Sequence, residues 1–212
     1  MHRSTPAIEL ASRSDVPEIL DLQEGNLLDN GGMLSVRLPR AWFEAAISDM
    51  PVLVARNDGR VVGYVASTSL AAQARIPVVQ AMLRAYPGSP GAYIYGPICV
   101  AESHRGRGLA RAMFAELRLG LPGREGFTFI RCDNAASIAA HNGVGMREVT
   151  QIYSGRHRVC RCRLSRVRDD HGESEFAEMR THGLRKCALT DRKSAVATLL
   201  AGLSNTSQNS AL

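Results

Sequence analysis

The sequence predicts an α/β fold in a single domain followed by a C-terminal tail, and three observations support this. Residues 52–56 and 61–67 are apolar strand-like segments joined by Asn57-Asp58-Gly59, a typical hairpin turn. Residues 92–100 form the most strand-like segment of the chain and lead through a glycine-rich loop into a helical pattern. After Leu164 the periodicity weakens, so we expect a domain over 1–164 and a tail over 165–212. That tail is expected to be mostly disordered, with one weak helix over 190–201.

The N-terminal part of this domain is expected to hold one strand and two helices. Residues 7–11 are predicted to form a short strand. Asp15 and Glu18 have the spacing of a capping box, which predicts a helix that starts there and continues to about residue 26. The sequence Asn30-Gly31-Gly32 interrupts the pattern and predicts a mobile lid. Pro39 then suits the first turn of a second helix, with apolar residues at 42, 43, 46 and 47 on one face.

The remaining elements follow from the same periodicities. Residues 70–91 read as an insertion with a short helix over 78–85. A helix over 109–119, a strand over 127–132, a short helix from 137 and strands over 146–153 and 158–164 complete the expected order. In the Arg-rich stretch 156–168, Cys160, Cys162 and Leu164 alternate with polar residues, as in an edge strand with one solvated face. No aromatic residues interleave with these arginines, so the stretch does not indicate nucleic-acid binding.

Composition limits the class of protein. The chain has 212 residues, a net charge of +6 and a pI near 9.4, which suits a polyanionic ligand without identifying one. No signal-like or membrane-spanning apolar run occurs, so a soluble, cytoplasmic protein is expected. The odd cysteine count favours reduced thiols. The pair Cys160 and Cys162, with His157 nearby, is a weak zinc signal, and no metal site is predicted.

The loop His104-Arg105-Gly106-Arg107-Gly108 has the chemistry of a phosphate site. It precedes a helix start, where N–H groups lack partners and the helix dipole favours an anion. Glycines at 106 and 108 allow the backbone to approach a ligand, and the two arginines add positive charge. The Walker and dinucleotide spacings are both absent. A basic turn without a ligand is an equally good interpretation of the loop by itself.

Two motifs in order resemble the GNAT superfamily of N-acetyltransferases. Arg105-x-x-Gly108-x-Ala110 fits the (Q/R)-x-x-G-x-(G/A) loop, and the segment from Asp133 to His141, followed by Gly145-Met146, fits the second signature. The order of elements over 7–164 is also similar to that family. The resemblance implies a central mixed β-sheet flanked by helices. It also implies that acetyl-CoA, as co-substrate, lies in the gap between two parallel strands that splay apart.

The resemblance also implies where the co-substrate binds. Backbone groups of one strand would hold the pantetheine arm, amides of the loop would hold the pyrophosphate, and Asn134 would contact the pantetheine or cap the following helix. The residues expected to bind it are Ile98, Cys99, Val100, Arg105, Gly106, Arg107, Gly108, Leu109, Ala110 and Asn134.

His141 stands where many family members have a tyrosine that protonates the departing thiolate. An imidazole can do the same, so His141 is the expected catalytic residue; the alternative is that it only lines the channel. The general base is left open among Glu24, Tyr93, Tyr95, Glu102 and a water chain. Cys99 is expected to be a buried strand residue rather than a nucleophile.

We therefore expect transfer of an acetyl group from acetyl-CoA to a primary amine by direct attack in a ternary complex. The first two helices, the insertion and the last strands would form the acceptor pocket. The acceptor is a small-molecule or protein amine, and the sequence does not identify it. A homodimer is left open. The alternative is a non-catalytic acyl-CoA-binding sensor, and membrane or nucleic-acid partners are not expected.

Overall fold

The computed structural model describes residues 5–154 and 160–167, with the backbone only for 153–154 and 160–167. Contacts divide the chain into two units, Met1–Asp169 and Asp170–Leu212, and every described residue lies in the first. The expectations for the tail and for the cysteines at 160 and 162 therefore fall outside the residues whose side chains are described. Among the described residues no helix is long and apolar enough to cross a membrane.

The strands and helices follow the order that the sequence predicts, with one further short helix, α3, at the start of the insertion. The strands are β1 (Ala7–Leu10), β2 (Leu53–Asn57), β3 (Arg60–Ser69), β4 (Tyr93–Val100), β5 (Gly126–Arg131), β6 (Arg147–Ser154) and β7 (Cys160–Val167). The α-helices are α1 (Val16–Glu24), α2 (Arg40–Asp49), α3 (Leu70–Gln73), α4 (Pro77–Ala85), α5 (Leu109–Gly120) and α6 (Ala135–Asn142). Short 3-10 turns are η1 (Arg13–Asp15), η2 (Leu28–Asn30) and η3 (Glu102–His104).

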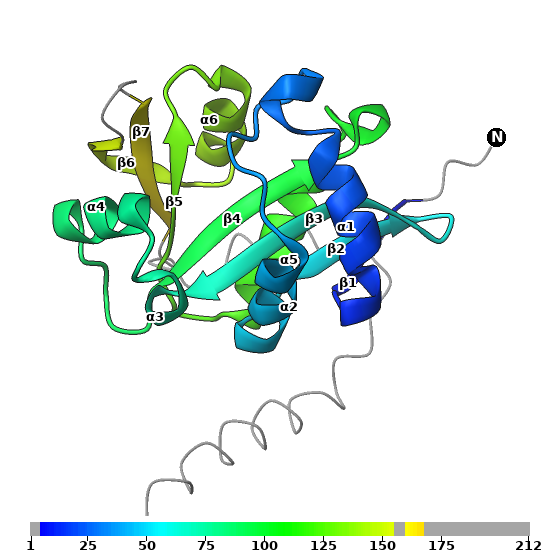
Figure 1. The fold of residues 1–212 in the computed structure, drawn as a ribbon, viewed down its shortest axis with the longest axis horizontal. Coiled ribbons are helices and arrows are strands. Elements are labelled where there is room, and N and C mark those ends of the chain that lie inside the picture. Colours follow the sequence, from blue (N-terminus) through cyan, green and yellow to red (C-terminus); the bar gives the residue numbers. More distant parts are fainter. Residues whose placement is uncertain (1–4, 155–159, 168–212) are drawn as a thin grey trace, which may run out of the picture. The chain divides into compact units, whose positions relative to one another are not determined.

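The strands form one mixed sheet in the order β1-β2-β3-β4-β5-β7-β6, in which only β4 and β5 are parallel. Figure 1 shows α1 and α2 on one face of this sheet and α5 on the other. The α1–α2 side buries Val16, Ile19 and Phe43 against Val54 and Tyr64. The α5 side buries a separate set, with Met113, Phe114 and Leu117 against Val65, Tyr93 and Tyr95. The predicted α/β fold with a central mixed sheet is confirmed.

An extra residue in β4 changes which side chains face α5. The pairing with β3 runs from Val65↔Ile98 to Ser67↔Tyr95, so β4 advances by three residues while β3 advances by two. Tyr95 and Ile98 therefore face the same side, toward the α5 core, whereas Cys99 joins the α1–α2 core. The bulge lies at Gly96-Pro97, whose peptide bond is cis. It reorients the end of the strand that leads into the glycine-rich loop.

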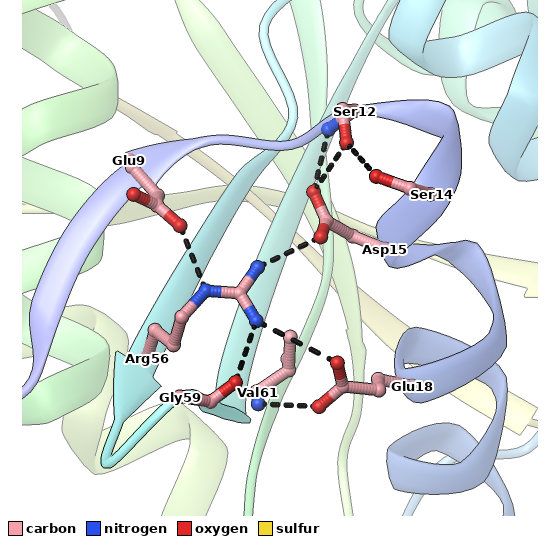
Figure 2. Close-up of polar contacts among 8 residues, drawn as sticks. All are labelled: Glu9, Ser12, Ser14, Asp15, Glu18, Arg56, Gly59 and Val61. Atoms are coloured by element: carbon pink, nitrogen blue, oxygen red, sulfur yellow. Dashed lines mark hydrogen bonds and ion pairs between the residues drawn. The ribbon is translucent and has the colours of Figure 1, made fainter.

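Arg56 of β2 attaches the start of α1 to the sheet, as Figure 2 shows. Its guanidinium donates to Glu9 of β1 (2.8 Å), to Asp15 (2.7 Å) and to the Gly59 carbonyl (3.0 Å), and lies 3.6 Å from Glu18. Of the three ion pairs that Arg56 forms, with Glu9, Asp15 and Glu18, the one with Asp15 is the least exposed. Only 13% of the Asp15 side chain is accessible to solvent. The partly buried guanidinium of Arg56 thus joins β1, the turn before α1, α1 itself and the hairpin.

The predicted capping box between Asp15 and Glu18 is wrong. The carboxylate of Asp15 instead accepts from the backbone N–H and hydroxyl of Ser12, at 2.7 and 2.9 Å, and so caps the preceding 3-10 turn. Glu18 accepts from the N–H of Val61, at 2.8 Å. The carboxylate of Asp15 is thus shared between Ser12 and Arg56, and that of Glu18 between Arg56 and the Val61 N–H, instead of capping α1.

The prediction that the Arg-rich strand lies at an edge is also wrong. β7 pairs with β5 on one side and β6 on the other, so β6 is the edge strand. β7 follows β6 in the sequence and pairs with it antiparallel, but in the sheet β7 lies between β6 and β5. Alternation along a strand reports that its two faces differ, but says nothing of whether both of its backbone edges are paired.

Candidate active site

The candidate site starts where β4 and β5 part. The two parallel strands pair only at Tyr93↔Gly126 and Ile94↔Phe127, at their N-terminal ends. Beyond Ile94, β4 stays paired with β3 up to Val100 while β5 pairs with β7. Over the second half of β4, the facing edges of β4 and β5 therefore have no strand partner in the part of the chain that the structure describes. Apart from the Val100 carbonyl, which accepts from Nε of Arg105 at 3.2 Å, backbone groups there are available to a ligand that enters between the strands.

Ile98 and Val100 direct their backbone groups into this gap. The N–H of Ala101 donates to Val62 of β3, at 2.9 Å. Since peptide groups alternate in direction along a strand, the N–H and C=O groups of Ile98 and Val100 point to the opposite edge, toward β5. Cys99, between them, turns its side chain to the α1–α2 core, where its thiol donates to the Tyr64 hydroxyl at 3.3 Å. Burial raises the pKa of Cys99 to about 11, which favours the neutral thiol of a core residue.

The glycine-rich loop continues from this edge to the start of α5. Gly106 and Gly108 have φ of +70° and +77°, a conformation that favours glycine, and an added Cβ at either position would meet no atom within 4 Å. The first helical hydrogen bond runs from Ala112 to the Gly108 carbonyl at 2.9 Å. The N–H groups of Leu109 and Ala110, which precede it, are those that a helix start leaves without partners. Within the described chain, no acceptor is found for the N–H groups of Gly106 and Arg107 either.

The two arginines of this loop differ in their surroundings. Arg105 donates from its backbone N–H to Glu102 (3.2 Å), from Nε to the Val100 carbonyl (3.2 Å) and from Nη2 to Oδ1 of Asn26 (3.0 Å). Arg107 is exposed, and its guanidinium contacts no polar group among the described residues. Of the two arginines expected to bind the co-substrate, Arg105 is thus the one whose side chain is already hydrogen-bonded to other described residues.

Asn134 follows β5 and begins α6. Its side-chain oxygen accepts from the N–H of Ser137 at 3.0 Å, which is an N-cap bond, as one of the two sequence-based interpretations expects. The amide NH₂ is not used by this cap. Asn134 therefore fixes the start of α6 at the end of β5, on the far side of the gap from Ile98.

His141 is buried, with 6% of its surface exposed, on the last turn of α6. Its Nδ1 lies 2.6 Å from the Ser137 carbonyl; because a carbonyl oxygen can only accept, Nδ1 carries a proton. Its ring packs edge-on against Tyr95, 5.4 Å between centroids, and Tyr95 directly follows Ile94, the last residue of β4 that pairs with β5. Burial lowers the pKa of His141, opposed by the hydrogen bond to Ser137. The resting imidazole is therefore neutral near pH 7, with Nε2 as a proton acceptor.

The candidates for a separate general base are arranged less favourably. Tyr93 and Tyr95 are buried, and burial raises the pKa of Tyr93 to about 12 and that of Tyr95 further. Glu24 is paired with Arg37 at 2.8 Å, and Glu102 is an exposed residue of η3. Neither phenol is a ready proton acceptor near pH 7, and Glu24 is already engaged by Arg37.

Sequence reasoning did not identify how the segment between α1 and α2 is held. Gln23, only 2% exposed, donates to the carbonyl of Leu38 and accepts from its N–H, both at 2.9 Å. This reciprocal pair joins the end of α1 to the start of α2. A cavity of about 400 Å³ lies at the same place, lined by Leu20, Asp21, Gln23, Glu24, Arg37, Leu38, Pro39 and Arg40. An amide that bonds a residue fifteen positions away leaves no local pattern in the sequence.

The described residues include no group of three His, Cys, Asp or Glu side chains suited to a metal ion. The arrangement is instead that of a gap between strands, bordered by unpaired backbone groups, loop amides at a helix start and a neutral buried imidazole.

Several solved structures share this fold. A putative acetyltransferase from Salmonella typhimurium, yncA with its cofactor acetyl-CoA, has a TM-score of 0.60 and 20% identity, over 81% of this chain and 98% of that one. A ribosomal-protein-alanine N-acetyltransferase from Brucella melitensis has a TM-score of 0.56 and 24% identity, over 76% and 99%. A phosphinothricin acetyltransferase from Sinorhizobium meliloti in complex with acetyl-CoA has a TM-score of 0.57 and 18% identity, over 81% and 95%. At these identities the likeness concerns the fold.

The sequence itself matches a family model. No curated protein gives a significant match to the chain. The model of the acetyltransferase (GNAT) family matches residues 16–146, which run from the start of α1 through α6 and include both sides of the β4–β5 gap. With the match covering more than half of the chain, the parted strands and the glycine-rich loop are those of a member of the GNAT acetyltransferase family.

Proposed function

We propose that this protein transfers the acetyl group of acetyl-CoA to a primary amine, by direct attack of the amine while both substrates are bound. The observation that carries the proposal is the parting of β4 and β5 after Ile94, which leaves the Ile98 and Val100 backbone facing the gap next to the unpaired amides at the start of α5. Two of the similar structures were solved with acetyl-CoA.

The residues around the gap fit acetyl-CoA. A pantetheine arm carries amide groups that need strand-like partners, and the N–H and C=O groups of Ile98 supply them. A pyrophosphate needs several N–H donors at close range, which Gly106, Arg107, Gly108, Leu109 and Ala110 offer at a positive helix end. The open space at the Cβ positions of Gly106 and Gly108 is the space that the phosphates would fill. Asn134 would add its free NH₂ from the β5 side.

When bound, acetyl-CoA supplies a thioester, an acyl group that a neutral amine can attack. The new bond joins the amine nitrogen to the acetyl carbon, and the bond that breaks joins that carbon to sulfur. The nitrogen must lose a proton and the sulfur, leaving as a thiolate, must gain one. The protein is therefore required to accept a proton from one atom and return a proton to the other.

His141 is the residue best placed for this proton movement. In its resting state Nδ1 is protonated and bonded to Ser137, so Nε2 is free to accept a proton from the attacking nitrogen. Once protonated, the imidazolium can donate the same proton to the departing sulfur, which is the acid role predicted from the sequence. Burial, which lowers the pKa of His141, makes the protonated form a good donor.

The acceptor side of the site is proposed to be formed by the segment between α1 and α2, where Gln23 closes the loop and the 400 Å³ cavity lies. The carboxylate of Asp21 on this cavity suits a cationic amine before it is deprotonated, whereas that of Glu24 is already paired with Arg37.

A screen of primary amines tests the proposal, with released CoA thiol as the readout. Amines should include amino acids, small diamines, aminated antibiotics and peptides with a free N-terminal alanine. Thiol release that depends on both acetyl-CoA and one amine class supports the proposal. Tight acetyl-CoA binding with no release for any amine would instead identify a non-catalytic acyl-CoA sensor.

A further inference from the structure

Arg105 joins the loop that follows β4 to the segment that follows α1. Its Nε donates to the carbonyl of Val100 at the end of β4, and its Nη2 donates to Oδ1 of Asn26, 79 positions away in the chain. The two bonds use the forked geometry of the guanidinium, which a point-like ammonium does not reproduce.

Asn26 organises the segment that Arg105 reaches. Its side-chain NH₂ donates to the backbone carbonyl of Leu22 at 2.8 Å, and its backbone carbonyl accepts from the N–H of Leu34 at 2.9 Å. Gly32 packs so closely on it that an added Cβ would lie 1.9 Å from the Asn26 oxygen. The residues from 26 to 34 thus form a closed loop around the backbone of Asn26, and the side chain of Asn26 faces Arg105.

Arg107 provides the contrast within the same motif. It lies two residues further on and is exposed, and its guanidinium has no polar contact among the described residues. It is therefore available to an anionic ligand, whereas two nitrogens of Arg105 are already bonded to the protein.

We propose that Arg105, although it opens the cofactor motif, is a positioning residue for the acceptor side: it holds residues 26–34 against the end of β4 instead of binding the phosphates. This rests on the proposed function, which puts the acceptor next to the α1–α2 segment. The contact also makes the loop that binds acetyl-CoA and the loop that borders the acceptor parts of one hydrogen-bonded unit.

Two matched variants test the proposal, Arg105→Met and Arg107→Met, each of which keeps an unbranched apolar stem and removes one charge. The dissociation constant of acetyl-CoA, measured by calorimetry, is expected to change less than about threefold in Arg105→Met. In Arg107→Met the dissociation constant is expected to rise about tenfold or more, the usual effect of losing a charge-assisted hydrogen bond.

Amide hydrogen exchange of the ligand-free protein supplies the second readout. The N–H groups of Gly32 and Leu34, bonded to Leu27 and Asn26, are expected to exchange about three- to tenfold faster in Arg105→Met, the effect of one partly exposed hydrogen bond. Arg107→Met should leave them unchanged. In an Asn26→Ala background, Arg105→Met should have little further effect, because its partner is already absent.

Acetyl-CoA binding that weakens equally in both variants, with unchanged exchange at Gly32 and Leu34, would overturn the proposal and make Arg105 a phosphate ligand. Faster exchange over the whole domain would also overturn it, since the role would then be general stability. If the unsubstituted protein does not bind acetyl-CoA, the proposed function fails, while the exchange pattern still decides whether Arg105 holds the segment.

Discussion

Replacing Arg56 by methionine should weaken the attachment of α1 to the hairpin while retaining the apolar stem of the side chain. The bond to Asp15 is the strongest that is lost, because it is short and only 13% of that carboxylate is exposed. A charge-assisted hydrogen bond of this kind contributes about 1.5–3 kcal/mol. The pairs with Glu9 and Glu18, whose side chains are 49% and 43% exposed, add about 0–1 kcal/mol each. We expect the free energy of unfolding to fall by about 1.5–5 kcal/mol.

The loss of stability in Arg56→Met should also depend on pH. Partial burial raises the pKa of Asp15, but the hydrogen bonds from Ser12 and Arg56 outweigh it and the pKa is lowered overall. A carboxyl with a lowered pKa in the folded state contributes stability that is present above its unfolded-state pKa and lost as the pH falls through the folded value. The difference between the two proteins should therefore shrink as the pH falls from about 5 toward 2.

Urea unfolding at pH 7 and at several acidic pH values measures both effects. Arg60→Met is the matched control, because Arg60 begins β3 in the same hairpin, is exposed, and has no side-chain partner among the described residues. A loss in Arg56→Met no larger than that in Arg60→Met, or a difference that does not vary with pH, would refute the role assigned to this network.

Three further predictions concern catalysis, packing and the domain boundary. His141→Phe should lower kcat about 10²–10⁴-fold with little effect on acetyl-CoA binding, and the acidic limb of the pH–rate profile, below about pH 6.5, should disappear; a kcat within a few-fold of normal would leave His141 only lining the channel. Gly126→Ala should cost about 1–3 kcal/mol in urea unfolding, since its Cβ would lie 2.6 Å from the Tyr93 ring, whereas Gly120→Ala, with open space around it, should not destabilise. A chain ending at 169 should unfold cooperatively and bind acetyl-CoA, while one ending at 164 should be less stable, because it loses the pairs of residues 165–167 with β5; equal stability of the two would contradict the contribution of those pairs.

The parts of the fold that were predicted correctly depend on local signals. The hairpin turn at Asn57-Asp58-Gly59, the proline before α2 and the apolar face of α2 each lie within a few residues of the element that they specify. The two motifs that indicated the family are local as well, and the family is confirmed.

The features that were missed involve partners far apart in the chain. The insertion of β7 between β5 and β6 depends on pairing with a strand some thirty residues away, which alternation does not report. Asp15 and Glu18 were assigned to a helix cap because nothing in their vicinity signals Arg56, 41 and 38 positions later. The bulge in β4 had a local signal, since Gly96-Pro97 interrupts an otherwise regular strand, and such pairs often mark a bulge.

The roles of the site residues remain predictions that the geometry supports to different degrees. The positions of Ile98, Val100, Gly106, Gly108 and the α5 start fit the proposed cofactor site, because the local motif specifies both the loop and the helix start. The engagement of Arg105 with Asn26 was not foreseeable, because it depends on how the α1–α2 segment folds over the end of β4.

The thermal shift caused by acetyl-CoA tests the central claim most directly, measured on the unsubstituted protein and on Gly108→Val. A ligand that binds only the native state raises the melting temperature, and a hundredfold excess over its dissociation constant corresponds to about 2.7 kcal/mol. Gly108 has a φ of +77° at the start of α5, where valine is strained and its side chain would occupy the proposed pyrophosphate position. Each protein is compared with its own ligand-free melting temperature, so that a loss of stability alone does not alter the result. A clear shift in the unsubstituted protein that is mostly lost in Gly108→Val is the predicted result; an equal shift in both would contradict the placement of acetyl-CoA at this loop.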